Sequence, residues 1–313
     1  MRSFRFVVLA GAVAATVAAA AWGGPSRLRF SFDAPVSGLA ADRGSLWVSI
    51  AGDDLVLRLD LRTGRRLARI VLPRADRRAF GGGTLAAGRG RIWIAAPVRV
   101  TGDPSVGNAS GWIGRLDPRS LRLRLVQVHG DRPAYVGSGG AGVWTSGGHT
   151  VRRVDAVTGK VTGRVHFGRY VGAVAVTRRA VWVAGSNTVE LKKIDPRTLK
   201  ILTSVRVGRC AAGSSLAVVG GRVWAATDHG LVAVGAASGR VVARVALPYT
   251  GAIAYDGSRL WALARGGVYS ISGGVVTKRL SLSSQVYGLL VAGGGQAWFT
   301  DEATNSLRRL PAG

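Results

Sequence analysis

Two adjacent pairs of residues, Asp228-His229 and Asp301-Glu302, carry the side chains best suited to catalysis in this sequence. Carboxylate oxygens are the hard ligands that Mg²⁺ and Ca²⁺ prefer, and a histidine beside a carboxylate can act as a general base. One hypothesis is therefore a metal-assisted lyase or hydrolase in which His229, Asp301 and Glu302 are catalytic. Asp228, Asp301 and Glu302 would then hold Mg²⁺ or Ca²⁺.

The competing interpretation is a non-enzymatic scaffold without a cofactor, and we favour it. Loop carboxylates can pair with loop arginines, and the sequence contains no recognisable metal-ligand spacing, Ser-His-acid triad, phosphate loop or paired-cysteine site. Such a scaffold would bind a protein or a small-molecule ligand. The candidate contact residues are Asp53, Trp112, His149, Arg169, Asn187, Arg209, Asp228, His229, Tyr249, Arg265 and Tyr287.

A repeat marked by tryptophan must position these residues. Seven tryptophans sit in short apolar triplets at intervals of 37 to 51 residues. A period of about 40 residues in a strand-like sequence is typical of a β-propeller, whose four-stranded blades use roughly 40 to 50 residues each. The seven are Trp47, Trp93, Trp144, Trp182, Trp224, Trp261 and Trp298.

Each repeat divides into four short strands separated by turn residues. In the first repeat, alternating apolar and polar residues predict strands over 38–41, 46–50, 55–60 and 65–72. The fourth repeat predicts strands over 173–176, 180–184, 189–195 and 200–207, and the sixth over 252–255, 259–263, 267–271 and 275–282. The fold class is therefore all-β, a seven-bladed propeller of four-stranded antiparallel blades.

The last repeat lacks a fourth strand after its third, 306–310. Residues 27–32 have the alternation of an outer strand and precede the first blade. We expect them to complete the last blade, which closes the ring and removes an exposed sheet edge. Residues 26–313 then form a single domain.

The seven tryptophans and the recurrent aspartates have structural interpretations. A ring at the same second-strand position of every blade is expected to pack against a neighbouring blade rather than to contact a ligand. An aspartate that begins a turn can accept backbone N–H bonds. The predicted turn aspartates are Asp60, Asp117, Asp155 and Asp195.

Propeller geometry brings the loops between second and third strands to the same face as the loops between blades. The candidate residues lie mainly in these two kinds of loop. Trp112 is outside the tryptophan repeat and follows the long loop 97–111. We predict that any binding site lies on this loop face.

The fourth repeat resembles the YVTN family of β-propellers. The matching segments are VWVAGSNTV (181–189), IDPRT (194–198) and VRVG (205–208). The resemblance implies a propeller over essentially the whole mature chain. It does not imply one activity, because these propellers serve both as binding scaffolds and as enzymes.

The seventh repeat is similar to those of streptogramin lyases. Trp298-Phe299-Thr300-Asp301 and the downstream Asn305 match the pattern Trp-Phe-Thr-Glu-x-x-x-Asn, with aspartate in place of glutamate and in one blade only. This resemblance implies a metal ion held by acidic residues and a histidine base at the mouth of the channel.

The N-terminus has the organisation of a secretory signal. A basic segment, 1–5, precedes an uncharged run, 6–21, that ends in three alanines. We predict a signal peptide over 1–24 and a secreted or extracytoplasmic chain whose mature part has no transmembrane domain. An uncleaved membrane anchor is the second choice.

The net charge of +27 comes mainly from arginine, since only five of the 43 basic residues are lysines. A strongly basic surface attracts anionic polymers, so an anionic envelope polymer is a candidate partner, although coding bias alone can produce this composition. The arginines form no aromatic-interleaved groove, so we predict no specific nucleic-acid binding. Cys210 is the only cysteine and excludes an intramolecular disulfide. We expect a monomer.

Overall fold

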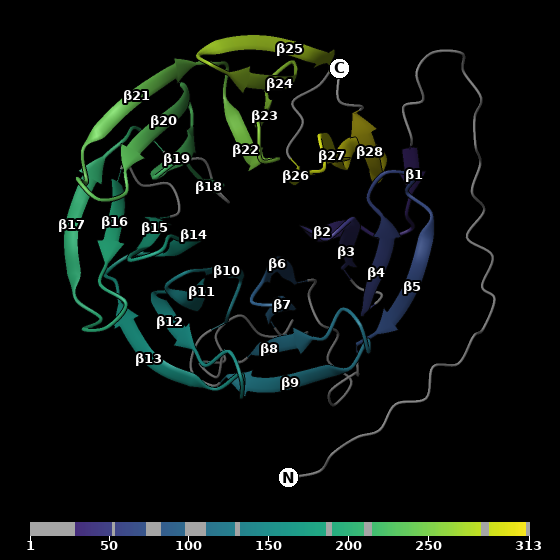
Figure 1. Cartoon of the computed structure of the whole chain (residues 1–313), viewed down its shortest axis with the longest axis horizontal. Coiled ribbons are helices and arrows are strands. Elements are labelled where there is room, and N and C mark those ends of the chain that lie inside the picture. Colours follow the sequence, from purple (N-terminus) through teal and green to yellow (C-terminus); the bar gives the residue numbers. More distant parts are fainter. Residues whose placement is uncertain are drawn as a thin grey trace.

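The computed structural model describes residues 29–51, 54–72, 83–97, 111–128, 132–185, 190–209, 215–282 and 288–310. Their strands form seven four-stranded antiparallel sheets arranged around a central axis (Figure 1). This arrangement confirms the predicted seven-bladed β-propeller. The predicted signal segment 1–24 and Cys210 lie outside the described residues.

Each blade runs from an inner strand beside the axis to an outer strand at the rim (Figure 1). Blade 1 comprises β2 (Val36–Asp42), β3 (Ser45–Ile50), β4 (Leu55–Asp60) and β5 (Arg66–Val71). Blade 2 comprises β6 (Thr84–Gly88), β7 (Arg91–Pro97), β8 (Gly111–Leu116) and β9 (Leu123–Val128). Blade 3 comprises β10 (Tyr135–Gly139), β11 (Gly142–Gly147), β12 (Thr150–Val154) and β13 (Val161–His166). Blade 4 comprises β14 (Val171–Val176), β15 (Val181–Gly185), β16 (Glu190–Ile194) and β17 (Ile201–Arg206). Blade 5 comprises β18 (Leu216–Val219), β19 (Arg222–Thr227), β20 (Gly230–Gly235) and β21 (Val241–Ala246). Blade 6 comprises β22 (Thr250–Tyr255), β23 (Leu260–Ala264), β24 (Gly267–Ser272) and β25 (Val275–Ser281). Blade 7 comprises β26 (Leu290–Gly293), β27 (Gln296–Asp301), β28 (Ser306–Leu310) and β1 (Arg29–Ser31), with a 3-10 helix η1 (Glu302–Thr304) after β27.

The inner strands begin two residues earlier than the alternation predicts. β2, β14 and β22 start at Val36, Val171 and Thr250 rather than at residues 38, 173 and 252. In each of these strands the pairing with the second strand shifts register just after the first residue. A bulge inserts an extra residue and breaks the period of two, so the residues before it do not have the pattern of a strand.

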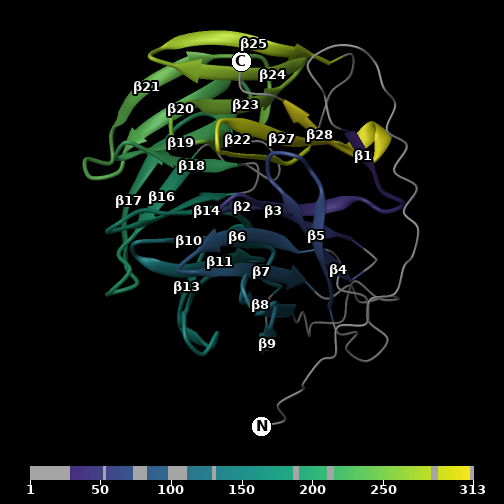
Figure 2. The same cartoon turned by 45° about the vertical axis from the view of Figure 1, so that its right-hand side comes forward.

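The ring closes in blade 7, where strands from opposite ends of the chain pair. β1 lies antiparallel beside β28, and Phe30 is opposite Leu307 (Figure 2). The Phe30 ring also stacks on the Trp298 ring, with 5.9 Å between the centroids. The predicted N-terminal closing strand is therefore confirmed, over Arg29–Ser31 within the described residues.

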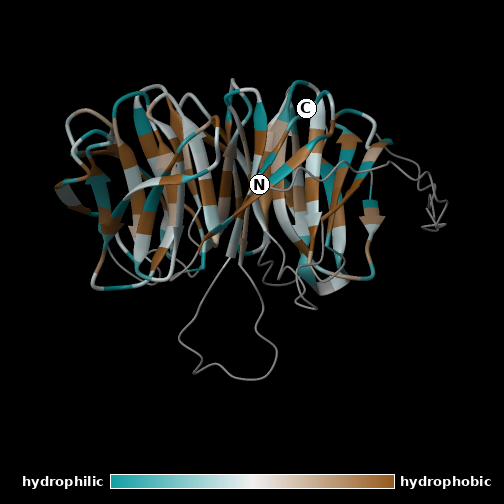
Figure 3. Ribbon diagram, turned by 90° about the horizontal axis from the view of Figure 1, so that it is seen from below, coloured by the Kyte–Doolittle hydropathy of each residue, from teal (hydrophilic) through white to brown (hydrophobic). Residues whose placement is uncertain are grey.

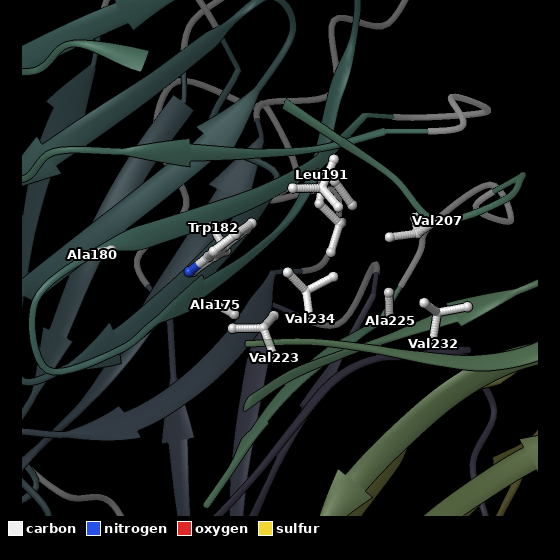
Figure 4. Packing of buried hydrophobic residues seen from close by; sticks show 11 residues of the cluster. Ala175, Ala180, Trp182, Leu191, Val207, Val223, Ala225, Val232 and Val234 are labelled. Atoms are coloured by element: carbon white, nitrogen blue, oxygen red, sulfur yellow. The ribbon is translucent and has the colours of Figure 1, made fainter. Parts of the chain in front are cut away.

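The hydrophobic core is divided into seven clusters, one between each pair of neighbouring blades. Each cluster contains the second-strand tryptophan of one blade packed against the first three strands of the next. Trp182, for example, packs beside Val223 and Val234 of blade 5 (Figure 4). A side view shows hydrophobic residues along the strands of every part of the ring, with hydrophilic residues between them (Figure 3). The tryptophans are thus spacers between blades, as the repeat predicts.

A second repeated contact places a cation over the tryptophan. In blade 1, Arg58 lies directly across the strand pair from Trp47, with its guanidinium 5.3 Å from the ring centroid. The same side chain donates a hydrogen bond to the turn between the third and fourth strands of the next blade. Four blades make this bond: Arg58 Nη1 to Pro118 O (3.0 Å), Arg115 Nη1 to Ala156 O (3.2 Å), Arg153 Nη1 to Pro196 O (3.0 Å) and Lys193 Nζ to Ala237 O (2.8 Å). Part of the large positive charge therefore has a structural role.

Small side chains let the inner strands approach one another closely. A Cβ atom on Gly38 would overlap the backbone of Gly83 in the next blade. Beside these contacts, Ser49 Oγ donates to Gly83 O across the blade boundary at 2.5 Å, and Ser146 Oγ donates to Gly172 O. The inner ring therefore tolerates little added volume.

The turn aspartates cap their own turns, as predicted. Asp195 Oδ1 accepts the backbone N–H groups of Arg197 (2.7 Å) and Thr198 (3.0 Å). Asp60, Asp117 and Asp155 make the same pair of bonds. In all four turns, the N–H of the residue three positions on is the main cause that lowers the pKa of the carboxyl below its ordinary value.

We expect Trp144→Ala to lower the free energy of unfolding by about 3–5 kcal/mol, because the ring is fully buried between blades 3 and 4. Trp112→Ala is the matched control, since this ring is only partly buried in β8. Urea unfolding followed by circular dichroism measures both variants. Equal losses would contradict the special role of the repeated tryptophans.

We expect a variant with asparagine at Asp60, Asp117, Asp155 and Asp195 to lose less stability in acid than the wild type. A carboxyl with a lowered folded-state pKa stabilises the fold above the unfolded pKa of about 4, and this contribution is lost as the pH falls through the folded pKa. The stability gap between the two proteins should therefore be widest near pH 7 and narrow below pH 4. Urea midpoints between pH 7 and pH 2 measure it, and parallel curves would refute this account of the turns.

Candidate functional site

Hydrogen bonds tie the two kinds of loop together on one face of the ring. The N–H of Asp228, after the second strand of blade 5, donates to Arg209 O in the preceding interblade loop at 3.0 Å. Arg265 N–H donates to Tyr249 O in blade 6 at 2.8 Å. The structure thus places these four candidate residues on the predicted loop face.

Exposed cationic and aromatic side chains characterise this face. Arg169, Arg209 and Arg265 are exposed, in or beside the loops of blades 4, 5 and 6. The His149 ring lies 4.5 Å, centroid to centroid, from the ring of Tyr170, which is 63% exposed. Tyr170 is not among the residues predicted from the sequence, although its position next to Arg169 in an interblade loop is a signal that could have identified it.

Lys192 adds a further cation close to this region. Its Nζ lies 5.5 Å from the centroid of Phe167, which precedes the same interblade loop. The Phe167 N–H donates to His149 O at 2.8 Å. This pair has no signal in the sequence, because the two residues belong to different blades.

Asp228 and His229 form a weak pair. His229 Nε2 is 3.8 Å from Asp228 Oδ2, and the histidine side chain is 91% exposed. The other carboxylate oxygen, Oδ1, is buried and accepts no hydrogen bond from the residues that the structure describes. The histidine therefore points into solvent instead of being held by the carboxylate.

Asp301 is a buried residue with a cationic partner. Its Oδ2 accepts a hydrogen bond from Arg308 Nη1 at 3.2 Å, and the Arg308 guanidinium lies 5.4 Å from the centroid of Phe299. Glu302 begins η1; it keeps an exposed surface, but burial of its carboxyl raises the pKa. The carboxyl of Asp301 is thus occupied by an ion pair within blade 7.

The other residues of the lyase-like motif also have structural contacts. Trp298 and Phe299 are buried in the core. Thr300 Oγ1 accepts the Leu289 N–H at 2.7 Å. Asn305 ends η1 with a φ of 42°, a left-handed conformation that asparagine tolerates better than most residues. The motif is accounted for by the geometry of the loop.

The acidic and histidine candidates do not form one cluster. Asp228 and His229 follow β19 in blade 5, whereas Asp301 and Glu302 lie in blade 7. Within the described ranges, no three His, Cys, Asp or Glu side chains come together as metal ligands. The arrangement that a metal-assisted mechanism needs from Asp228, Asp301 and Glu302 is therefore not present.

The remaining candidates have separate positions. Trp112 lies in β8 opposite Ala96 and packs, partly buried, against the cluster between blades 1 and 2. Its ring therefore contributes to the core. Asp53, Asn187 and Tyr287 lie outside the described residues.

Comparisons with solved structures identify the fold. The chain is similar to BamB from Moraxella catarrhalis (TM-score 0.56, 13% identity, covering 88% of this chain and 83% of that one). It is similar to a chain of the Mitotic Checkpoint Complex (TM-score 0.70, 12% identity, covering 99% and 98%). It is also similar to the Neurospora crassa Pan2 WD40 domain (TM-score 0.69, 9% identity, covering 88% of each). At these identities the likeness establishes the propeller fold alone.

Sequence comparisons do not assign a family. No family model matches the chain, and no curated protein matches it in sequence. Among the described residues, no helix has the length and apolar character needed to cross a membrane.

We expect Asp301→Asn to lower the free energy of unfolding by about 1–2 kcal/mol, because it removes the charged acceptor of Arg308. The loss should be the same with Mg²⁺, with Ca²⁺ and with a chelator. Glu302→Gln is the control and should have little effect on stability, because no described residue pairs with that carboxylate. A metal-induced rise in melting temperature that disappears in Asp301→Asn would instead identify Asp301 as a metal ligand.

Proposed function

We propose that this chain is a secreted or extracytoplasmic propeller that binds a partner protein through its loop face, without catalysis and without a cofactor. The observation that carries the proposal is the set of exposed cationic and aromatic side chains on that face. These residues are His149, Arg169, Tyr170, Arg209, His229 and Arg265. Arginine and tyrosine are enriched at protein interfaces, since both offer a large contact area together with a polar group.

The charge of this face favours an acidic partner. Arg169, Arg209 and Arg265 are exposed, and none of them forms an ion pair with a carboxylate in the described part of the chain. Unpaired surface cations accelerate association with a partner of opposite charge and select against basic partners. The face therefore suits a protein with an acidic surface.

Comparison with other propellers agrees with a protein-binding role. One similar structure is a chain of the Mitotic Checkpoint Complex, which its name describes as an assembly. We assign the chain to the YVTN type of propeller on the strength of the repeat in blade 4, and its localisation on the basic and apolar residues 1–24.

The loop-face arginines can be tested against arginines elsewhere on the ring. We expect Arg169→Gln/Arg209→Gln/Arg265→Gln to weaken capture of an extracytoplasmic partner by at least about tenfold, because charge-assisted contacts are lost from the interface. The control, Arg69→Gln/Arg124→Gln/Arg164→Gln, removes the same charge from exposed positions on the outer strands β5, β9 and β13.

The chain is expressed with its N-terminal segment, recovered from the extracytoplasmic fraction and used as bait at moderate salt. Equal loss of capture in both triple variants would refute loop-face binding and support general attraction to an anionic envelope polymer. Retention of the chain in the cytoplasm would refute the proposed localisation.

A further inference from the structure

Blade 6 departs from the repeated contact between a third-strand cation and the turn of the next blade. The position opposite its tryptophan, Trp261, is Ser270 rather than an arginine or lysine. Blade 5 also lacks the cation, since Ala233 lies opposite Trp224. In blade 6 the small Ser270 side chain leaves space beside it.

The space beside Ser270 is a pocket of about 350 Å³. It is formed by the turn between β22 and β23 together with the strands β24 and β25. Four hydroxyl side chains, two arginines and one valine line it: Ser258, Ser270, Ser272, Thr277, Arg259, Arg279 and Val275. It lies on the face of the ring that carries the turns between third and fourth strands, opposite the loop face.

The pocket wall is positively charged. Arg279 Nε donates to Ser270 Oγ at 2.8 Å, which fixes the guanidinium at the wall and leaves the Ser270 hydroxyl proton available for donation. Arg259 also lines the pocket, and its guanidinium lies 5.7 Å from the centroid of the Trp261 ring. No carboxylate is among the lining residues.

Asp256 precedes the lining residues Ser258 and Arg259 in the same turn but does not itself line the pocket. The Asp256 side chain is fully buried, and its carboxylate accepts bonds from Ser258, from the Arg259 N–H and from Trp261 Nε1. Its approach to Arg259 Nε is long, at 3.8 Å. The carboxylate therefore organises the turn and neutralises the pocket only in part.

We propose that this pocket binds a small molecule through a phosphate or sulfate group held between Arg259 and Arg279. Hydroxyl and guanidinium donors reach the pocket from three elements, which matches an oxyanion that accepts hydrogen bonds in several directions. The pocket volume lies in the range of small-molecule sites, so the pocket has room for the rest of the molecule to which the phosphate or sulfate is attached. This site is independent of partner binding on the loop face.

The test uses inorganic phosphate, inorganic sulfate, glucose 6-phosphate and glucose as probes, titrated into the chain at low salt by calorimetry. We expect saturable binding of the anions, with glucose 6-phosphate binding most tightly. Its dissociation constant should be about 1 mM, because the site is open to solvent and each contact contributes little binding free energy. Glucose should not bind. Inorganic phosphate and sulfate measure binding of the oxyanion alone. Glucose 6-phosphate measures whether the pocket also accommodates a group attached to the oxyanion.

The variants separate this pocket from the general positive charge. Arg279→Gln should weaken glucose 6-phosphate binding by at least about tenfold. Arg164→Gln, which removes the same charge from the exposed outer strand β13, should change it by less than about twofold. Ser270→Ala should also weaken binding, and unchanged unfolding midpoints would show that each variant retains the fold.

Three outcomes would overturn the proposal. Equal weakening by Arg279→Gln and Arg164→Gln would indicate non-specific attraction to a basic protein. Binding of glucose as tight as that of glucose 6-phosphate would indicate a neutral saccharide site. The absence of saturable binding by any probe would show that the pocket is not a site for these anions.

Discussion

The packing of one tryptophan between each pair of blades is the interaction on which the rest of the structure depends. A four-stranded blade has two faces, and neither can be buried within the blade itself. The second-strand ring fills the space between sheets, and the cation across from it reaches the next blade in four of the seven interfaces. Because the tryptophan contact recurs in every interface, neighbouring blades pack in the same way and their loops reach the same face.

This repetition explains why the fold could be predicted from the sequence. The tryptophan interval and the period of two are local patterns, and each is repeated often enough to separate signal from chance. The closing strand could also be predicted, since one repeat lacked a strand and residues 27–32 supplied it. The early starts of β2, β14 and β22 were missed because a bulge breaks the alternation on which the prediction relies.

The candidate site was only partly predictable, because its contacts join residues from different loops. Topology correctly placed Arg209, Asp228, Tyr249 and Arg265 on one face. Sequence could not reveal that Asp301 is paired with Arg308, that Trp112 packs on the core, or that Tyr170 lies against His149. Ser270 is a further case, because the pocket that it lines also needs Arg259 and Arg279, which lie on other elements of blade 6.

Hydrogen exchange of the native chain, resolved by mass spectrometry, tests the central claim most directly. If the ring is held by seven equivalent interfaces and closed by β1 on β28, then the second strands of all seven blades should exchange by the same global unfolding event. The peptide containing β28 should be as protected as the third strands of blades 1 to 6. Exchange of blade 7 well before the others would contradict the account, because it would show that the ring opens at its seam while the remaining blades stay folded.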